Sequence, residues 1–147
     1  MLFRSHHPPA TVLVPGCGQG QEAAALDARG YRVTAMDVVG KPGILQGDFL
    51  ESDFGQRFDL LCERGLFANL RPSQRRRYVE AAARALRPGG QLFGVLVEGP
   101  SGDQPPYGTT AAEVLSMVAP WFDVVRLEPG AFQVAGHPQL EAIFVRR

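Results

Sequence analysis

The chain carries no excess of charge, which argues against a strongly charged partner. Fifteen basic residues balance fifteen acidic ones, and Lys41 is the single lysine. Proteins that bind nucleic acid or an acidic membrane surface usually show a clear basic excess. The run Arg75, Arg76 and Arg77 lacks interleaved aromatics, so we expect a solvated helix face there. Apolar runs also stay below the roughly 18 residues of a membrane span. We therefore expect neither nucleic acid nor a membrane as a partner.

Cysteine is equally sparse. Cys17 and Cys62, the only two, are both expected at strand ends. Such low usage is typical of the reducing cytoplasm and predicts no disulfide. The histidines and cysteines also lack the spacing of a metal site, so we expect no metal. The 147 residues, 45% of them hydrophobic, are enough for one buried core, and we expect a single domain over residues 1–147.

Apolar strands alternate with helices along the chain. Short apolar runs bounded by turns predict strands, and runs of strong helix formers predict helices. We expect strands at 11–14, 31–39, 58–63, 91–98, 121–128 and 140–147, and helices at 22–29, at 72–87 and from a cap at Thr110 to Ala119. The link between the last two strands is too short for a helical crossover, which predicts antiparallel pairing. The pattern indicates an α/β fold with a Rossmann-like, mostly parallel sheet and an antiparallel C-terminal strand.

The stretch VLVPGCGQG places three glycines directly after the first expected strand. Gly16, Gly18 and Gly20 are spaced G-x-G-x-G. Without Cβ atoms they let the backbone approach a ligand closely, while the next helix offers free N–H groups. By itself this pattern could also be only a tight strand-to-helix turn. Asp37 ends the second expected strand, where nucleotide folds bind a ribose diol. The glycine-rich turn and Asp37 together therefore favour a nucleotide site.

The segment GDF, residues 47–49, is a third signal. Asp48 could accept a hydrogen bond from the exocyclic amine of a base, and Phe49 could stack on the base plane. Taken alone, the segment is equally well explained as a loop acid followed by a core phenylalanine.

In combination, these segments resemble a known family. The order VLVPGCGQG, YRVTAMDVV, GDFL, FDLLCERG, LRPGGQLFGVLV is similar to that of the class I S-adenosylmethionine-dependent methyltransferases. The proline in VPGCG, the acid-Arg-Gly after residues 58–62 and a later Pro-Pro-aromatic resemble the thiopurine S-methyltransferase family and its thiol, halide and tellurite methylating relatives. The resemblance covers almost the whole chain from Thr11. It implies S-adenosylmethionine as cofactor and methyl transfer to a small soft nucleophile such as a thiol or thiopurine.

The resemblance also implies roles for matching positions. Cofactor-binding positions would be Gly16, Cys17, Gly18, Gly20, Asp37, Val38, Asp48, Phe49 and Glu63. Glu63 stands where the family carries an aspartate, which is one methylene shorter. Arg64 would face the acceptor, and we expect it to steer an anionic substrate or to lower its pKa, since a soft anion needs no strong general base. Pro106 and Tyr107 would lie at the mouth of the substrate site.

Two parts of the family pattern are missing. Only about ten residues precede the first strand, where the family carries a segment that helps cover the cofactor and substrate. Residues 38–43 are too few for the usual helix between the second and third strands. Residues 44–46 are then either a poor edge strand or a segment that passes by the sheet. We expect an open adenine side with weak or partner-dependent cofactor binding, and a homodimer could cover that side.

Two other functions stay open at this level. One is a reduced methyltransferase-like domain that binds cofactor or a partner without turnover, which the two missing parts favour. The other is a nicotinamide-dependent oxidoreductase. The G-x-G-x-G spacing, in place of G-x-G-x-x-G, and the lack of length for a second mononucleotide half argue against it.

Overall fold

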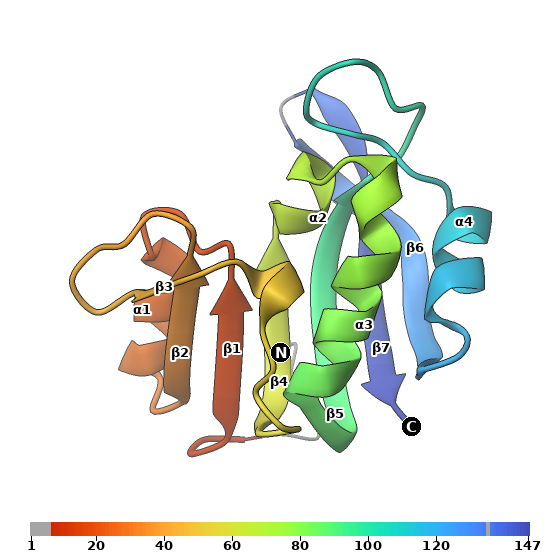
Figure 1. Cartoon of the computed structure of the whole chain (residues 1–147). Helices are drawn as coiled ribbons and strands as arrows, with labels where there is room; N and C mark the ends of the chain where they lie inside the picture. Colours follow the sequence, from red (N-terminus) through yellow and green to blue (C-terminus); the bar gives the residue numbers. More distant parts are fainter. Residues whose placement is uncertain (1–6, 135) are drawn as a thin grey trace.

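The computed structural model describes residues 7–134 and 136–147, and its centre is a seven-stranded sheet (Figure 1). The strands are β1 (Thr11–Pro15), β2 (Arg32–Asp37), β3 (Leu45–Gln46), β4 (Phe58–Arg64), β5 (Leu86–Val97), β6 (Phe122–Val134) and β7 (His137–Arg146). Their order is β3-β2-β1-β4-β5-β7-β6. The first five are parallel, and β7 runs antiparallel to β5 and β6. The Rossmann-like sheet and its antiparallel C-terminal pairing are therefore confirmed.

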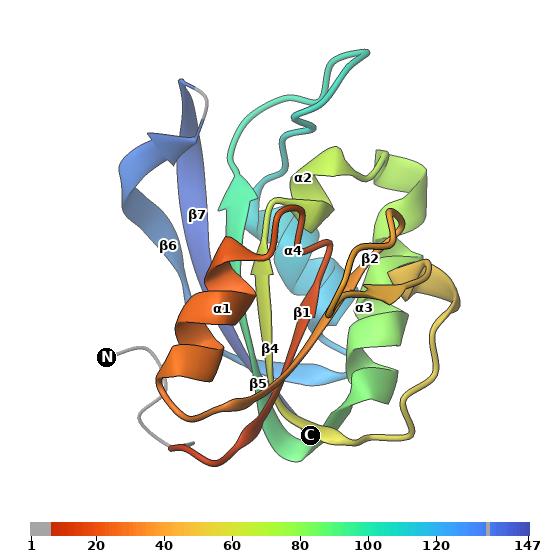
Figure 2. The ribbon, with the colours of Figure 1, turned by 90° about the vertical axis from the view of Figure 1, so that its left-hand side faces the viewer.

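Helices cover both faces of this sheet. They are α1 (Gln21–Ala28), α2 (Leu66–Asn69), α3 (Arg75–Ala85) and α4 (Ala111–Val118), with 3₁₀ turns η1 (Phe49–Glu51) and η2 (Pro72–Gln74). Figure 2 shows α1 on one face and α3 and α4 on the other. The larger apolar core lies beneath α3 and α4, and a smaller one lies beneath α1. The short helix α2 instead follows the carboxyl end of β4, at the edge of the sheet where ligands of such folds bind.

The helix boundaries follow local capping chemistry. The expected helix at 72–87 is shorter, because Pro72–Gln74 forms a 3₁₀ turn and the chain enters β5 at Leu86. Its expected buried stripe is confirmed, since Val79, Ala82 and Leu86 are all at most 3% exposed. The cap of α4 is also confirmed, because the Glu113 N–H donates to Thr110 Oγ1 at 3.2 Å.

Several strand limits differ from the expected ones. The second strand ends at Asp37, because its carboxylate accepts the N–H of Val39 and turns the chain away from the sheet. The strand expected at 91–98 begins earlier, at Leu86, and an irregularity in its pairing with β4 accommodates the residues before Gln91. The last two strands extend into their link as a long hairpin.

The short link after β2 is the feature that distinguishes this sheet. Residues 38–44, all in the described part of the chain, contain no helix. β3 nevertheless pairs parallel with β2, through Met36 with Leu45 and Asp37 with Gln46. Of the two alternatives for residues 44–46, an edge strand or a segment that passes by the sheet, the structure therefore has the short edge strand. The expected lack of a cover before β1 concerns residues 1–10, of which the first six lie outside the described residues.

Candidate functional site

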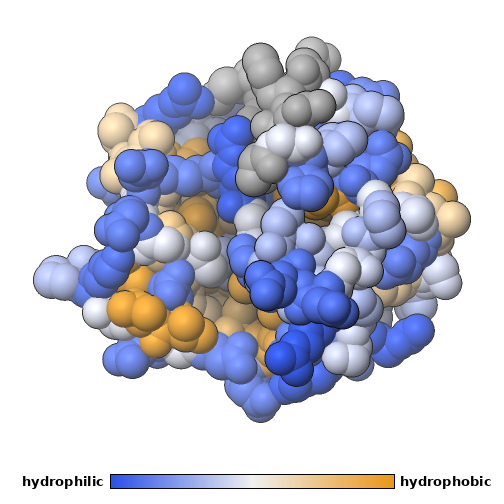
Figure 3. All heavy atoms as spheres, turned by 90° about the horizontal axis from the view of Figure 1, so that it is seen from above, coloured by the Kyte–Doolittle hydropathy of each residue, from blue (hydrophilic) through white to orange (hydrophobic). Residues whose placement is uncertain are grey.

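A cavity of about 570 Å³ opens at the carboxyl ends of β1, β2 and β4. This volume is within the range of small-molecule sites. Its walls come from five segments: Gly16 and Gly18; Met36, Asp37 and Val38; Gly47, Asp48, Phe49 and Leu50; Arg64, Gly65, Leu66, Asn69 and Leu70; and Gln74. Figure 3 looks down on this end of the molecule and shows polar and hydrophobic atoms exposed side by side. The topology thus brings together residues far apart in sequence.

The glycine-rich turn forms one wall. Gly16 and Gly18 have φ values of +61° and +58°, which side chains other than glycine rarely adopt. A Cβ on Gly16 would stand 3.0 Å from the Cβ of Leu66, so the turn packs closely on α2. A Cβ on Gly18 would meet no described atom within 4 Å and would stand in open space at the cavity wall. The turn therefore keeps the backbone at Gly18 exposed to a ligand.

Asp37 fixes this turn from the end of β2. Its Oδ2 accepts the N–H of Gly18 at 2.9 Å, and its Oδ1 accepts the N–H of Val39 at 3.0 Å. These two bonds hold the pKa of the carboxyl below its usual value. The bond from Val39 has the larger effect and the bond from Gly18 the smaller. The ionised carboxylate can still accept bonds from a pair of hydroxyls, because each oxygen has two lone pairs.

Asp48, Phe49 and Val38 line the side toward η1. Asp48 Oδ1 accepts the N–H of Leu50 at 2.9 Å and caps η1. Phe49 is 4% exposed, and its ring packs edge-on against Tyr78 with 5.6 Å between centroids. It is therefore a core residue at the floor of the cavity. Val38 is 65% exposed and offers an apolar side chain at the rim.

Glu63 lies beneath the cavity and is 1% exposed. Its two oxygens accept the N–H groups of Gly65, at 3.2 Å, and of Phe67, so the carboxyl caps the start of α2. Burial raises its pKa from the usual 4.5 to about 7, although both N–H groups act in the opposite direction. Among the described residues, Glu63 is not one of those that line the cavity. Glu63 therefore supports the start of α2 and the backbone next to Arg64.

Arg64 lies at the junction of the main cavity and a smaller recess of about 220 Å³. Its side chain is 71% exposed and pairs with Glu22 of α1 at 3.5 Å. Cys17 and Glu22 line the same recess. Sequence reasoning missed Glu22, whose only signal is its place in the first turn of the helix after the glycines. Among the described residues Arg64 thus forms one weak ion pair, so its side chain can be redirected.

Gly20 lies elsewhere. It caps α1 with φ +84° and lines a third hollow, of about 370 Å³, on the side of Ile44. Among the described residues it is not part of the wall of the main cavity.

The loop after β5 holds the predicted acceptor-side residues. Tyr107 is buried, at 8% exposure, and its N–H donates to the carbonyl of Ala68 at 2.7 Å. Pro106 is half-buried. Within the described residues neither one lines the cavity, so the loop approaches the site by contacting α2.

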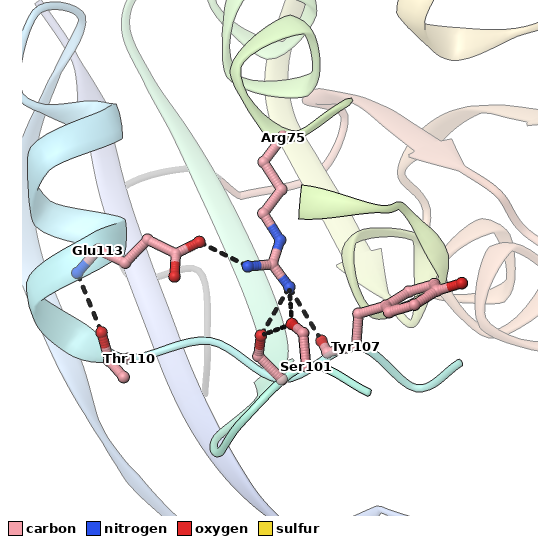
Figure 4. Close-up of polar contacts among 6 residues, drawn as sticks. Arg75, Ser101, Tyr107, Thr110 and Glu113 are labelled. Carbon is pink, nitrogen blue, oxygen red and sulfur yellow. Dashed lines mark hydrogen bonds and ion pairs between the residues drawn. The ribbon is translucent and has the colours of Figure 1, made fainter. Parts of the chain in front are cut away.

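The expected solvated face of Arg75, Arg76 and Arg77 is wrong at its first member. Arg75 is 1% exposed, and its guanidinium binds the loop after β5 and Glu113, as Figure 4 shows. Arg76 and Arg77 are exposed. The physical reason is helical phase, because Arg75 precedes the buried Val79 and Ala82 by four and seven residues.

Two other kinds of site are absent from the described part of the chain. In the described residues no helix is both long and apolar enough to cross a membrane. The same residues contain no cluster of three His, Cys, Asp or Glu side chains that could hold a metal ion.

Comparison with known proteins gives the family. A family model described as a methyltransferase domain matches residues 13–94, more than half of the chain. Probable thiol methyltransferase 2 of Arabidopsis thaliana is 26% identical over an alignment of 132 residues, and the match covers 77% of this chain and 58% of that protein. The chain therefore spans less than two thirds of the curated relative that it matches.

Solved structures show the same fold. The 1,6-didemethyltoxoflavin-N1-methyltransferase of Burkholderia thailandensis, solved with S-adenosylhomocysteine, has a TM-score of 0.81 at 24% identity over 94% of this chain and 71% of its own. A TehB-like S-adenosylmethionine-dependent methyltransferase of Corynebacterium glutamicum has a TM-score of 0.75 at 21% identity over 94% and 80%. As the resemblance to class I S-adenosylmethionine-dependent methyltransferases predicted, the chain belongs to the methyltransferase domain family.

Proposed function

We propose that the protein transfers the methyl group of S-adenosylmethionine to a small soft nucleophile, such as a thiol, a thiopurine or a related anion. The observation that carries the proposal is Arg64, a mostly exposed cation between two compartments of one site. The larger compartment has features of a nucleoside site, and the smaller one adjoins the same glycine turn at Gly16 and Cys17. The similarity to a probable thiol methyltransferase supports the choice of acceptor.

The residues of the cavity fit the proposed cofactor. Asp37 carries an ionised carboxylate beside the glycine turn, suited to a ribose diol. Gly18 leaves the space beside its backbone open, in the direction where a Cβ would stand. Asp48 and Val38 supply a hydrogen-bond acceptor and an apolar contact for a base, with Phe49 beneath. A similar fold was solved with S-adenosylhomocysteine, the product of methyl transfer from this cofactor.

When bound, S-adenosylmethionine supplies an already activated methyl group on a sulfonium. The contribution of the chain is then positioning, which can lower a barrier by roughly 7–11 kcal/mol. Arg64 attracts an anionic acceptor to the mouth and favours its ionised form through its positive charge. Glu63 keeps α2 in place through the N–H groups of Gly65 and Phe67, and thereby orients the backbone next to Arg64.

A second candidate is cofactor binding without turnover. Val38 and Val39 are 65% and 58% exposed, on a link that is too short for a helix. These exposures favour an open adenine side and weak binding by a single chain.

A homodimer in the cytoplasm is the proposed physiological form, in which a second copy would cover these valines. Sedimentation of the protein with and without S-adenosylhomocysteine tests the dimer.

Transfer of labelled methyl groups to a panel of thiols, thiopurines and amines tests the proposed function. We expect label on a thiol or thiopurine, and a rise in melting temperature with S-adenosylhomocysteine but none with NAD. S-adenosylhomocysteine binding with no labelled product from any acceptor would favour the second candidate. An Arg64→Ala enzyme that binds cofactor and methylates at an unchanged rate would contradict the role of Arg64.

A further inference from the structure

We propose that Arg75 is the positioning residue of the acceptor side, holding the loop between β5 and α4 against α2 without touching either reactant. The inference rests on the proposed methyl transfer and on the predicted place of Pro106 and Tyr107, two residues of this loop, at the mouth of the substrate site. Arg75 begins α3, directly after Gln74, which lines the cavity. The guanidinium itself is buried and lies outside the cavity wall among the described residues.

The contacts of the guanidinium converge on one segment of the chain. Its Nη2 donates to the carbonyl oxygens of Gly108, at 2.7 Å, and Tyr107, at 3.2 Å, and lies 3.4 Å from Ser101 Oγ. Nη1 pairs with Glu113 in the first turn of α4 at 2.5 Å. Figure 4 shows these bonds meeting at the guanidinium, with the ring of Tyr107 pointing away from it. One side chain therefore ties both ends of the loop and the helix that follows.

The polar contacts of the buried Arg75 go beyond what a residue that only fills the core would need. Burying a charge is costly unless it is paired and hydrogen-bonded, and an apolar residue of similar size would pack without that cost. The planar fork of arginine can bind several carbonyl and carboxylate oxygens at fixed angles, which lysine cannot reproduce. The contacts are therefore suited to fixing the shape of the loop, because residues 98–110, all of them described, form no helix or strand.

The guanidinium also contacts α2, which connects the loop to the cavity. Its central carbon lies 5.0 Å from the ring centroid of Phe67, a residue of α2. The Tyr107 N–H also donates to the carbonyl of Ala68 on the same helix. Leu66 and Asn69 of α2 line the cavity. Arg75 thus holds α2 and the loop together at one wall, whereas the wall of Gly18 and Asp37 depends on separate hydrogen bonds.

The two ends of the loop are joined by backbone hydrogen bonds that do not involve Arg75. The N–H of Gly99 donates to the carbonyl of Thr109, and the N–H of Thr109 donates to the carbonyl of Val97. A Cβ on Gly108 would stand 2.2 Å from the carbonyl oxygen of Gly99. Loss of Arg75 is therefore expected to loosen the loop between these anchors while the sheet remains formed.

Arg75→Lys tests the proposal, because it keeps the charge and removes the fork. Arg76→Lys, on the adjacent exposed residue, is the matched control. Ser101→Ala removes a contact within the loop and serves if Arg75→Lys does not fold. For each protein we would measure S-adenosylhomocysteine affinity by calorimetry, the KM and kcat of the best thiol acceptor, and hydrogen exchange of residues 99–109.

We expect Arg75→Lys to raise the acceptor KM about ten- to hundredfold, as misplaced positioning groups do, and to speed exchange in the loop. Cofactor affinity should stay within about twofold, and the control should match the parent. Ser101→Ala should show the same pattern at smaller size. Equal losses for cofactor and acceptor, or unchanged loop exchange, would overturn the proposal. If no acceptor is methylated even by the parent, the proposed function fails, and exchange and cofactor affinity alone still decide whether Arg75 holds the loop selectively.

Discussion

The carboxylate of Asp37 joins the end of β2 to the glycine turn after β1, because its Oδ2 accepts the N–H of Gly18 at 2.9 Å. Its Oδ1 holds the N–H of Val39, so the same side chain also starts the link to β3. One residue therefore shapes two walls of the cavity and faces into it. This double use makes the proposed ribose contact inseparable from the shape of the turn.

Asp37→Asn should weaken S-adenosylhomocysteine binding at least about tenfold, because neutral hydrogen bonds are roughly half as strong as charge-assisted ones. The free energy of unfolding should fall by only about 1 kcal/mol, since the site is open to water. Calorimetry and urea denaturation measure both. The matched control is Asp53→Asn, whose carboxylate accepts the N–H of Gly55 in a similar local turn. Equal losses of affinity in the two variants would contradict the binding role of Asp37.

Gly16→Ala should distort the cavity through a specific contact. The new Cβ would lie 3.0 Å from the Cβ of Leu66 and 3.1 Å from its Cδ1, at a φ of +61°. Gly55→Ala is the control, because Gly55 has a φ of +63° and a Cβ there meets no described atom within 4 Å. Both should lose about 1–2 kcal/mol of stability from the left-handed backbone. Only Gly16→Ala should also reduce cofactor affinity, and equal effects on binding would show that the contact with Leu66 is unimportant.

The wall formed by Gly16, Gly18 and Asp37 could be predicted because its signals are local. Glycine spacing after an apolar strand identifies the turn, and the acid at the end of the next parallel strand must lie at the same edge of the sheet. The missing helix after β2 was also predictable, because the link is too short for one whatever its sequence. Chain length and residue type decide these features without knowledge of distant partners.

Arg75 and Glu63 could not be interpreted in the same way. Their burial depends on partners that no local pattern reveals: Gly108 and Glu113 for the arginine, and the N–H groups at the start of α2 for the glutamate. Charged residues are mostly exposed, so an arginine run is reasonably interpreted as a solvated face. Only the phase of the helix, which sets Arg75 in line with Val79, indicated otherwise.

Glu22→Gln should strengthen the action of Arg64 on an anionic acceptor. The two side chains pair at 3.5 Å, so Glu22 competes with the acceptor for the guanidinium. We expect the acceptor KM to fall about two- to threefold at low salt, with the difference reduced at high salt. Glu51→Gln is the control, because Glu51 pairs with the exposed Arg77 away from the cavity. An unchanged or higher KM in Glu22→Gln would show that Glu22 does not restrain Arg64.

Glu63 should make stability fall as the pH rises from about 4.5 to about 7. Burial raises the pKa of its carboxyl to about 7 in the folded protein, against 4.5 normally, so between these values the folded state binds more protons than the unfolded state. Unfolding releases this proton, so a rising pH favours the unfolded state. The free energy of unfolding falls by up to about 1.4 kcal/mol for each unit between the two pKa values. Glu63→Gln keeps one oxygen to accept an N–H of α2 and does not titrate. Thermal unfolding of both proteins from pH 4.5 to 8 measures the difference. The stability of the parent relative to Glu63→Gln should decline across this window and level off above it, whereas two parallel curves would mean that the carboxyl titrates near its usual pKa.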